Sequence, residues 1–228
     1  MMTRMFRDKI ERTIEVYIDD MVVRSKRETQ HNDDLKEVFA VLRHHKLCLN
    51  ADKCAFGVGP GKFLGYLITN RGIEVNPNQI EAVKCLKPPS NPKEVQVLTS
   101  MLVALNQFIS KFANRCRPFY QLLKKWKGFQ WNKECEKAFL DLKEYVMQAP
   151  MLTTPEPRED LYMYLSVSKH AMSVVLLRDQ GMQQLIYYIS KTLVNAKMRY
   201  LPLKNLVLAL VHATRKLPHY FQAHIVYV

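Results

Sequence analysis

The stretch from Ile14 to Val23 constrains the fold most, because its pattern predicts a β-hairpin with two acids at the turn. Apolar and polar residues alternate over residues 13–18, which is the period of a strand with one buried face. The apolar pattern resumes over residues 21–23, immediately after Asp19 and Asp20. The spacing therefore predicts a tight turn at Asp19-Asp20 between two antiparallel strands.

The acid pair at this turn has two interpretations. Aspartate is a common turn residue, so Asp19-Asp20 can serve the turn alone. Two carboxylates held close together also repel each other unless a cation neutralises them. A hard cation such as Mg²⁺ binds one or two carboxylates together with substrate phosphates. The hairpin by itself leaves both interpretations open.

Charge narrows the class of partner. The chain has 228 residues, of which 48% are hydrophobic, so a sizeable core is expected. Its 34 Lys and Arg and 21 Asp and Glu give a net charge of +13, which favours a polyanion: nucleic acid first, an anionic membrane second. Residues 75–127 hold nine basic and two acidic residues, more than half of the excess. A solvated basic face is the alternative for such a run.

The cysteine spacing argues against a zinc site, and the hydropathy argues against a membrane-spanning segment. No two cysteines form a C-x-x-C pair, and no His/Cys pattern has the spacing of a zinc site. Reduced thiols in an intracellular protein, cytoplasmic or nuclear, are therefore expected. No apolar run has membrane-spanning length, so no membrane partner is expected. The five cysteines are Cys48, Cys54, Cys85, Cys116 and Cys135.

Periodicity and turn residues predict the remaining elements. The first half should contain a helix over 2–12 that begins within a domain, a helix over 28–47, and strands over 54–58, 62–69 and 73–75. Helices should begin at Pro77, Pro92, Pro118 and residues 131–132, and the Pro-rich segment 150–157 suits a linker. Strands over 161–167, 172–177 and 184–190, a helix over 203–216 and a last strand over 224–228, where the chain stops, should follow. This order predicts an α+β fold.

Seven motifs in this order resemble one family. The chain is similar to the Pol polyprotein of gypsy-type LTR retrotransposons, plant elements in particular. Tyr17-Ile18-Asp19-Asp20 resembles a reverse transcriptase hairpin motif, and 62–66 resembles the primer-grip hairpin. The other matching motifs are 49–57, 105–111, 129–132, 187–191 and 220–224.

The resemblance implies three regions. Residues 1–75 would form part of a polymerase palm, 76–127 a thumb-like helical region, and 128–228 a connection and a truncated RNase H-like β-β-β-α unit. Nucleic acid, as an RNA–DNA hybrid or duplex, and the rest of a Pol polyprotein are the implied partners.

The resemblance also implies roles for single residues. Asp19 and Asp20 would be catalytic metal ligands, and Lys53 would face the triphosphate, although a solvated lysine beside a turn explains Lys53 nearly as well. Mg²⁺ is the implied cofactor of an intact relative, with weak or no binding expected here. An ordinary core strand would also explain Phe63 and Leu64. The implied nucleic-acid contacts are Tyr17, Phe63, Leu64, Gly65, Lys111, Arg115, Arg117, Lys124 and Lys125.

The chain departs from the family pattern at the polymerase site. Nucleotidyl transfer needs two Mg²⁺ ions about 3.5–4 Å apart, held by carboxylates from two strands. The family carries the second acidic strand upstream of the hairpin. Asp8 and Glu11 are expected in the opening helix and Glu15 on the hairpin strand itself, so no second acidic strand is expected here. The isolated chain is therefore expected not to polymerise.

The RNase H-like unit departs further. Nucleases of this kind resemble one another in using about four carboxylates around two metal ions. Residues 161–228 contain one, Asp179. Ser166 and Lys204 match positions where active relatives carry acids, so a catalytically inactive domain is expected. Three hypotheses follow: a reverse transcriptase fragment inactive alone, a non-catalytic nucleic-acid-binding remnant, and an interaction module or degenerating product.

Overall fold

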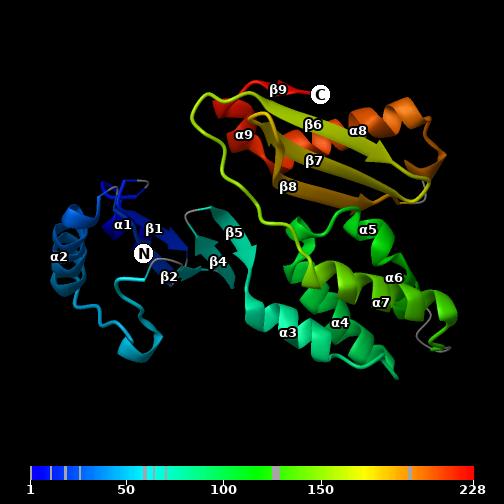
Figure 1. The fold of residues 1–228 in the computed structure, drawn as a ribbon, viewed down its shortest axis with the longest axis horizontal. Helices are drawn as coiled ribbons and strands as arrows, with labels where there is room; N and C mark the ends of the chain where they lie inside the picture. Colours follow the sequence, from blue (N-terminus) through cyan, green and yellow to red (C-terminus); the bar gives the residue numbers. More distant parts are fainter. Residues whose placement is uncertain are drawn as a thin grey trace. The chain divides into compact units, whose positions relative to one another are not determined.

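The chain folds into two units, Met1–Asn70 and Arg71–Val228 (Figure 1). The computed structural model describes residues 2–10, 12–17, 20–25, 27–58, 61–63, 65–69, 71–124, 129–194 and 197–228. Among these residues, no helix is both long and apolar enough to cross a bilayer.

The predicted hairpin is present in the first unit. Strands β1 (Ile14–Tyr17) and β2 (Asp20–Val23) pair antiparallel, with Tyr17 opposite Asp20. Helix α2 (Glu28–His44) packs against the hairpin, and the fully buried side chains of this core include Phe6, Ile14 and Val38. The prediction of a turn at both acids is wrong for Asp20, because Asp20 belongs to the β2 ladder. Ile18 and Asp19 lie outside the described residues.

The opening helix is shorter than the pattern predicts. Helix α1 covers only Met2–Met5, and Asp8 lies in the turns that follow it. The backbone N–H groups of Thr13 and Ile14 both donate to the carbonyl of Lys9, which turns the chain back into β1. This reversal ends the helix early and leaves Phe6 in the core.

The segment after α2 differs from the prediction in two places. Residues 54–58 are not a strand: Gly57 has φ +63°, and Phe56 and Val58 are exposed. The single strand predicted over 62–69 is instead a hairpin of β3 (Gly61–Phe63) and β4 (Tyr66–Thr69). Gly65 has φ +81°, a left-handed conformation that favours glycine and breaks the strand.

Helices make up the first part of the second unit, after the short strand β5 (Gly72–Val75). Asparagine side chains cap three of them: Asn76 accepts from the N–H of Asn78, Asn91 from the N–H of Glu94, and Asn132 from the N–H of Cys135. The short helix α5 is not predicted by the pattern. The helices are α3 (Pro77–Cys85), α4 (Pro92–Ala104), α5 (Phe112–Arg115), α6 (Arg117–Lys124) and α7 (Lys133–Met147), with a 3₁₀ turn η2 at Asn106–Phe108.

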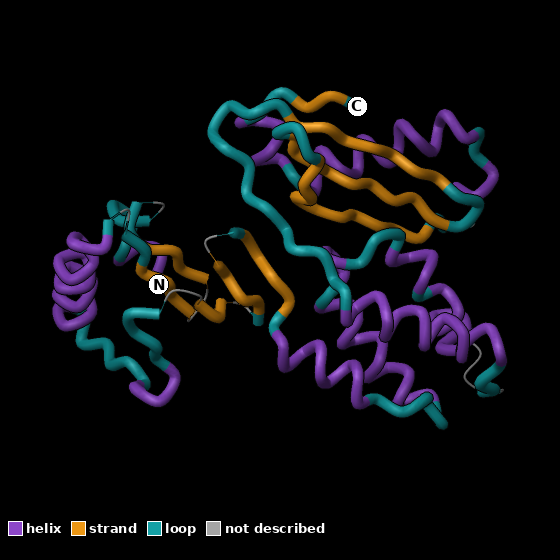
Figure 2. The backbone as a smooth tube through the Cα atoms, in the orientation of Figure 1, coloured by secondary structure: helices purple, strands orange, loops and turns teal. Residues whose placement is uncertain are grey.

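A four-stranded sheet forms the rest of this unit (Figures 1 and 2). Its order is β8-β7-β6-β9, and β9 pairs parallel with β6 while the other pairs are antiparallel. Helix α8 packs its small residues Ala209 and Ala213 into the sheet's core. The elements are β6 (Leu161–Val167), β7 (Ala171–Asp179), β8 (Gln183–Thr192), the 3₁₀ turn η4 (Lys197–Arg199), α8 (Pro202–Lys216), the unpredicted α9 (Pro218–Ala223) and β9 (Val226–Tyr227).

The Pro-rich segment predicted as a linker is tied down at several points. Ile73 and Leu152 exchange two backbone hydrogen bonds of 2.7 and 2.9 Å, and the N–H of Thr153 donates to the carbonyl of Leu185 at 2.7 Å. Gly72 permits this approach, because a Cβ there would lie 2.0 Å from the carbonyl oxygen of Leu152. The segment is therefore part of the folded unit.

A buried ion pair fixes the end of the same segment. Glu159 accepts from Nε of Arg178 at 3.1 Å, and Nη1 of Arg178 donates to the carbonyl of Thr154 at 2.7 Å. The two charged side chains are only 8% and 12% exposed. Arg178 on β7 therefore anchors residues 154–159 against the sheet.

We expect Arg178→Met to lower the free energy of unfolding by about 3–5 kcal/mol, because it leaves the Glu159 carboxylate buried without a counter-charge. Urea unfolding followed by far-UV circular dichroism measures this. Glu81→Gln is the matched control, since its pair with Lys84 is exposed and should contribute less than about 0.5 kcal/mol. Adding Glu159→Leu to Arg178→Met should recover most of the loss. Equal effects of Arg178→Met and Glu81→Gln would contradict the assignment.

Candidate functional site

The acidic hairpin presents an aromatic residue and a carboxylate side by side. Tyr17 is 54% exposed at the end of β1, and Asp20, its cross-strand partner, is exposed at the start of β2. Glu15 lies on β1, as predicted, and accepts from Nη2 of Arg24 at 2.7 Å. Glu15, the other described acid of this hairpin, is therefore paired with a cation of the same hairpin.

The described residues of the hairpin do not make up a metal-binding set. Asp20 is the one carboxylate among them without an ion-pair partner, and Asp19 lies outside the described residues. Among the residues that the structure describes, no group of three or more His, Cys, Asp or Glu side chains could hold a metal ion. Among the described residues, Asp20 alone does not provide the several carboxylate ligands that a pair of Mg²⁺ ions needs. The assignment of Asp19 and Asp20 as metal ligands stays a prediction.

The other predicted polymerase residues lie on short local elements of the first unit. Lys53 is the last residue of the 3₁₀ turn η1 (Ala51–Lys53), which Asn50 caps, and its exposed side chain has no ion-pair partner among the described residues. Phe63 ends β3 and Gly65 precedes β4, while Leu64 lies outside the described residues. These positions test neither the triphosphate role nor the primer-grip role.

The predicted basic contacts divide into exposed and internally engaged residues. Lys111, at the N-cap of α5, and Lys124, in the last turn of α6, are exposed. Arg115 and Arg117 are half-buried, and Lys125 lies outside the described residues. These cations contribute equally to the net charge, but they differ in how much of each side chain is exposed to solvent.

Arg115 stabilises the packing of α5 against α7. Its Nε donates to the carbonyl of Ser110 at 3.1 Å, and its guanidinium lies 4.5 Å from the ring centre of Tyr145. The hydroxyl of Tyr145 accepts from the N–H of Ser110 at 3.2 Å. Burial raises the pKa of Tyr188, on β8, to about 12; Tyr145 also raises it, whereas Arg115 lowers it. Arg115 is therefore already engaged within the protein.

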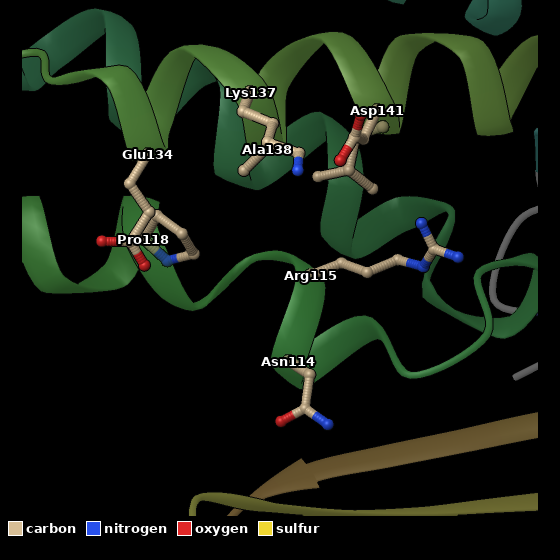
Figure 3. A pocket seen from close by; sticks show the side chains of 8 residues that line it. Asn114, Arg115, Pro118, Glu134, Lys137, Ala138 and Asp141 are labelled. Atoms are coloured by element: carbon tan, nitrogen blue, oxygen red, sulfur yellow. The ribbon is translucent and has the colours of Figure 1, made fainter.

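A small pocket lies beside Arg115 (Figure 3). It encloses about 210 Å³ between α5, the start of α6 and one face of α7. Two acids, Glu134 and Asp141, line it together with Arg115 and Lys137, so its charge is mixed. Ligand sites usually enclose about 300–1,000 Å³ with mostly apolar walls. Neither its size nor its charge makes it a site for an anionic substrate.

The RNase H-like positions are placed as the sequence predicts but carry no acids. Ser166 is exposed on β6, opposite Ser173 of β7. Lys204 is exposed on α8, with its ammonium 4.1 Å from the ring centre of Tyr200. Asp179 ends β7 and accepts from the N–H of Gly181 at 3.0 Å. The single carboxylate of 161–228 therefore serves a turn.

A second basic cluster was missed at the sequence level. Burial and then Lys191, Lys216, Lys197 and Arg215 lower the pKa of His212, on α8. These cations come from the end of β8, from η4 and from the end of α8. The signal was available, because residues 161–228 contain eight Lys and Arg and a single acid.

The two environments of the basic residues give a testable difference. We expect Arg115→Ala to lower the free energy of unfolding by about 1–2 kcal/mol, since it removes a hydrogen bond and a cation–π contact. Arg115→Lys should fall between Arg115→Ala and wild type, because lysine keeps the charge and loses the planar fork. Lys124→Ala, the control, should change stability by less than about 0.5 kcal/mol. Urea unfolding distinguishes them, and a neutral Arg115→Ala would disprove the structural role.

Two segments of the chain match known protein families. Residues 1–68 match the family model of reverse transcriptase (RNA-dependent DNA polymerase), and residues 131–228 match that of the RNase H-like domain found in reverse transcriptase. The retrovirus-related Pol polyprotein from transposon 297 of Drosophila melanogaster is 29% identical over 96% of this chain. The transposon Tf2-3 polyprotein of Schizosaccharomyces pombe is 26% identical over 92%. The chain spans 20% and 16% of these relatives.

Solved structures share the fold. The foamy viral protease-reverse transcriptase in complex with an RNA/DNA hybrid has a TM-score of 0.83 at 21% identity, over 95% of this chain and 29% of that one. The same protein in complex with double-stranded DNA has a TM-score of 0.80 at 21% identity, over 94% of this chain and 45% of that one. Residues 1–68 thus match a reverse transcriptase model, residues 131–228 match the RNase H-like domain found in reverse transcriptase, and the fold resembles that of a reverse transcriptase.

Proposed function

We propose that this chain is the part of a retrotransposon reverse transcriptase that holds a nucleic-acid duplex, and that it does not synthesise DNA alone. The observation that carries the proposal is the order of the two family matches along one chain with a net charge of +13. The likeness of the fold to a reverse transcriptase solved with an RNA/DNA hybrid supports it. RNA–DNA hybrid or double-stranded DNA is the proposed ligand.

The proposed binding region is the helical segment 76–127, in the role of a polymerase thumb between a partial palm (1–75) and the RNase H-like region (128–228). Lys111 and Lys124 are its best candidates for phosphate contacts, because both are exposed and neither forms an ion pair with a described carboxylate. Arg117 is a weaker candidate, being half-buried. Contacts of this kind neutralise phosphates and carry no base specificity.

Catalysis is proposed to depend on residues beyond this chain. Asp19 and Asp20 would bind Mg²⁺ together with an acid on a neighbouring strand, with Lys53 near the triphosphate. The described residues provide no such strand. The RNase H-like domain is proposed to be inactive, because Ser166 and Lys204 occupy positions where acids are needed.

We further propose that the source is a gypsy-type LTR retrotransposon, plant elements in particular, and that the chain works with the rest of a Pol polyprotein. The motifs at 105–111, 129–132, 187–191 and 220–224 support the element type. The transposon Pol polyproteins that match the chain support the polyprotein context.

Duplex binding should depend steeply on salt. A filter-binding titration with a hybrid duplex should give an affinity that falls with a slope of about −0.9 per phosphate contact on a log–log plot. Lys111→Gln and Lys124→Gln should each reduce the magnitude of that slope by about 1. Each should also weaken binding by a similar factor for every duplex sequence, because a phosphate contact reads no bases. The control is Lys36→Gln, which removes an exposed lysine paired with Asp33 on α2. A salt-independent affinity, or equal slopes for all three variants, would refute the proposed contacts.

The purified chain should show neither catalytic activity. Primer extension with Mg²⁺ should not rise above a no-enzyme control, because the residues that the structure describes provide no second acidic strand for the proposed site. Cleavage of a hybrid in Mn²⁺ should also be absent. Primer extension that Asp20→Asn abolishes would overturn the first expectation. Hybrid cleavage that Asp179→Asn abolishes would overturn the second, whereas activity that survives either variant indicates a contaminating enzyme.

A further inference from the structure

Helix α8 exposes an apolar stripe on the face opposite the sheet. Leu203, Val207 and Val211 are 72%, 55% and 40% exposed. Their spacing of four residues places them on one helical face over about 12 Å. The residues buried on the other face of the helix are Asn205, Ala209 and Ala213.

Cations run along one side of this stripe. Lys204 and Arg215 are eleven residues apart, close to three helical turns, so they lie on the same side of α8. Neither of these two cations pairs with a carboxylate in the described part of the chain, where Arg178 forms the one salt bridge of residues 161–228. The lowered pKa of His212 reflects burial and the same positive surroundings.

We propose that the exposed face of α8 binds an amphipathic helix that carries apolar residues at i, i+4 and i+8 and acidic residues along one flank. The apolar residues of such a helix would pack between Leu203, Val207 and Val211, which form an i, i+4, i+8 ridge of the kind that packs helix against helix. Its acids would face Lys204 and Arg215. The site is separate from the proposed phosphate contacts of 76–127 and does not depend on them.

Charge complementarity selects this partner over two others. A nucleic-acid backbone would pair with the cations but would leave the apolar stripe in water, without its contribution to binding. A second copy of α8 would cover the stripe but would bring no acids to the cations, because its own exposed face is basic. An acidic amphipathic helix satisfies both features at once.

The test uses the full 228-residue chain and a synthetic, lactam-bridged 16-residue helical peptide with leucines at i, i+4 and i+8 and glutamates along one flank. Fluorescence anisotropy should show saturable binding of the labelled peptide. Val207→Ser combined with Val211→Ser should weaken it at least 10-fold. The matched control is Val97→Ser with Val103→Ser, which changes two exposed valines of α4 that are 54% and 45% exposed and should leave the affinity unchanged.

A charge exchange tests the cationic row. Lys204→Glu with Arg215→Glu should weaken the glutamate-flanked peptide at least 5-fold and strengthen a lysine-flanked version of the same peptide. Circular dichroism of each variant verifies folding, which surface changes of this kind should preserve.

Three results would overturn the proposal. The first is peptide binding that the Val207/Val211 variant does not weaken. The second is no peptide binding, with DNA binding that the Lys204/Arg215 variant loses and the Val207/Val211 variant keeps, which assigns the surface to phosphate. The third is a concentration-dependent dimer in sedimentation that the Val207/Val211 variant abolishes, with no peptide binding, which assigns it to a second copy.

Discussion

The contact between α5 and β8 joins the helices and the sheet of the second unit. The N-cap of α5, Lys111, has φ +51° and makes no side-chain cap bond. The N–H of Ala113 in the first turn donates to Oγ of Ser190 on β8 at 2.9 Å, and Ser190 in turn lies 3.1 Å from Oγ of Ser173 on β7. A buried N–H without an acceptor costs about 1–3 kcal/mol, so one serine makes the short helix compatible with the sheet beneath it.

Local patterns determined how far the fold could be predicted. The hairpin, the Asn-capped helices and the strands β6 to β8 follow from period and caps that lie within a few residues of each other. The unpredicted α5 depends on Ser190, 77 residues away in the chain. Periodicity predicts one strand over 62–69 because the apolar run continues through Gly65, whose positive φ breaks it, whereas the resemblance of 62–66 to a hairpin agrees with the pairing of β3 and β4. Asp20 was predicted in the turn because the sequence does not show which residue lies opposite it, and the structure pairs it with Tyr17 on β1.

The candidate site shows the same division between local and distant determinants. The positions of Tyr17, Lys53 and Ser166 on their elements follow from neighbouring residues. The engagement of Arg115 does not, because Tyr145 lies on another helix 30 residues later. Arg178 was likewise counted as one more positive charge, although it is buried with Glu159. The net charge therefore overstates the number of cations that are available to bind a polyanion. Only the burial and the contacts of each side chain distinguish an available cation from one that is engaged within the protein.

The paired backbone of Ile73 and Leu152 has a topological consequence. Every helix from α3 to α7 lies between these two residues in the chain, so the helical segment leaves the fold and returns to it at neighbouring points. A segment with adjacent ends tolerates insertion well, because a change in its length does not displace the strands on either side. Changes in the length of the helical segment are thus expected to leave β5 and the sheet in register, provided that α5 keeps its contact with Ser190.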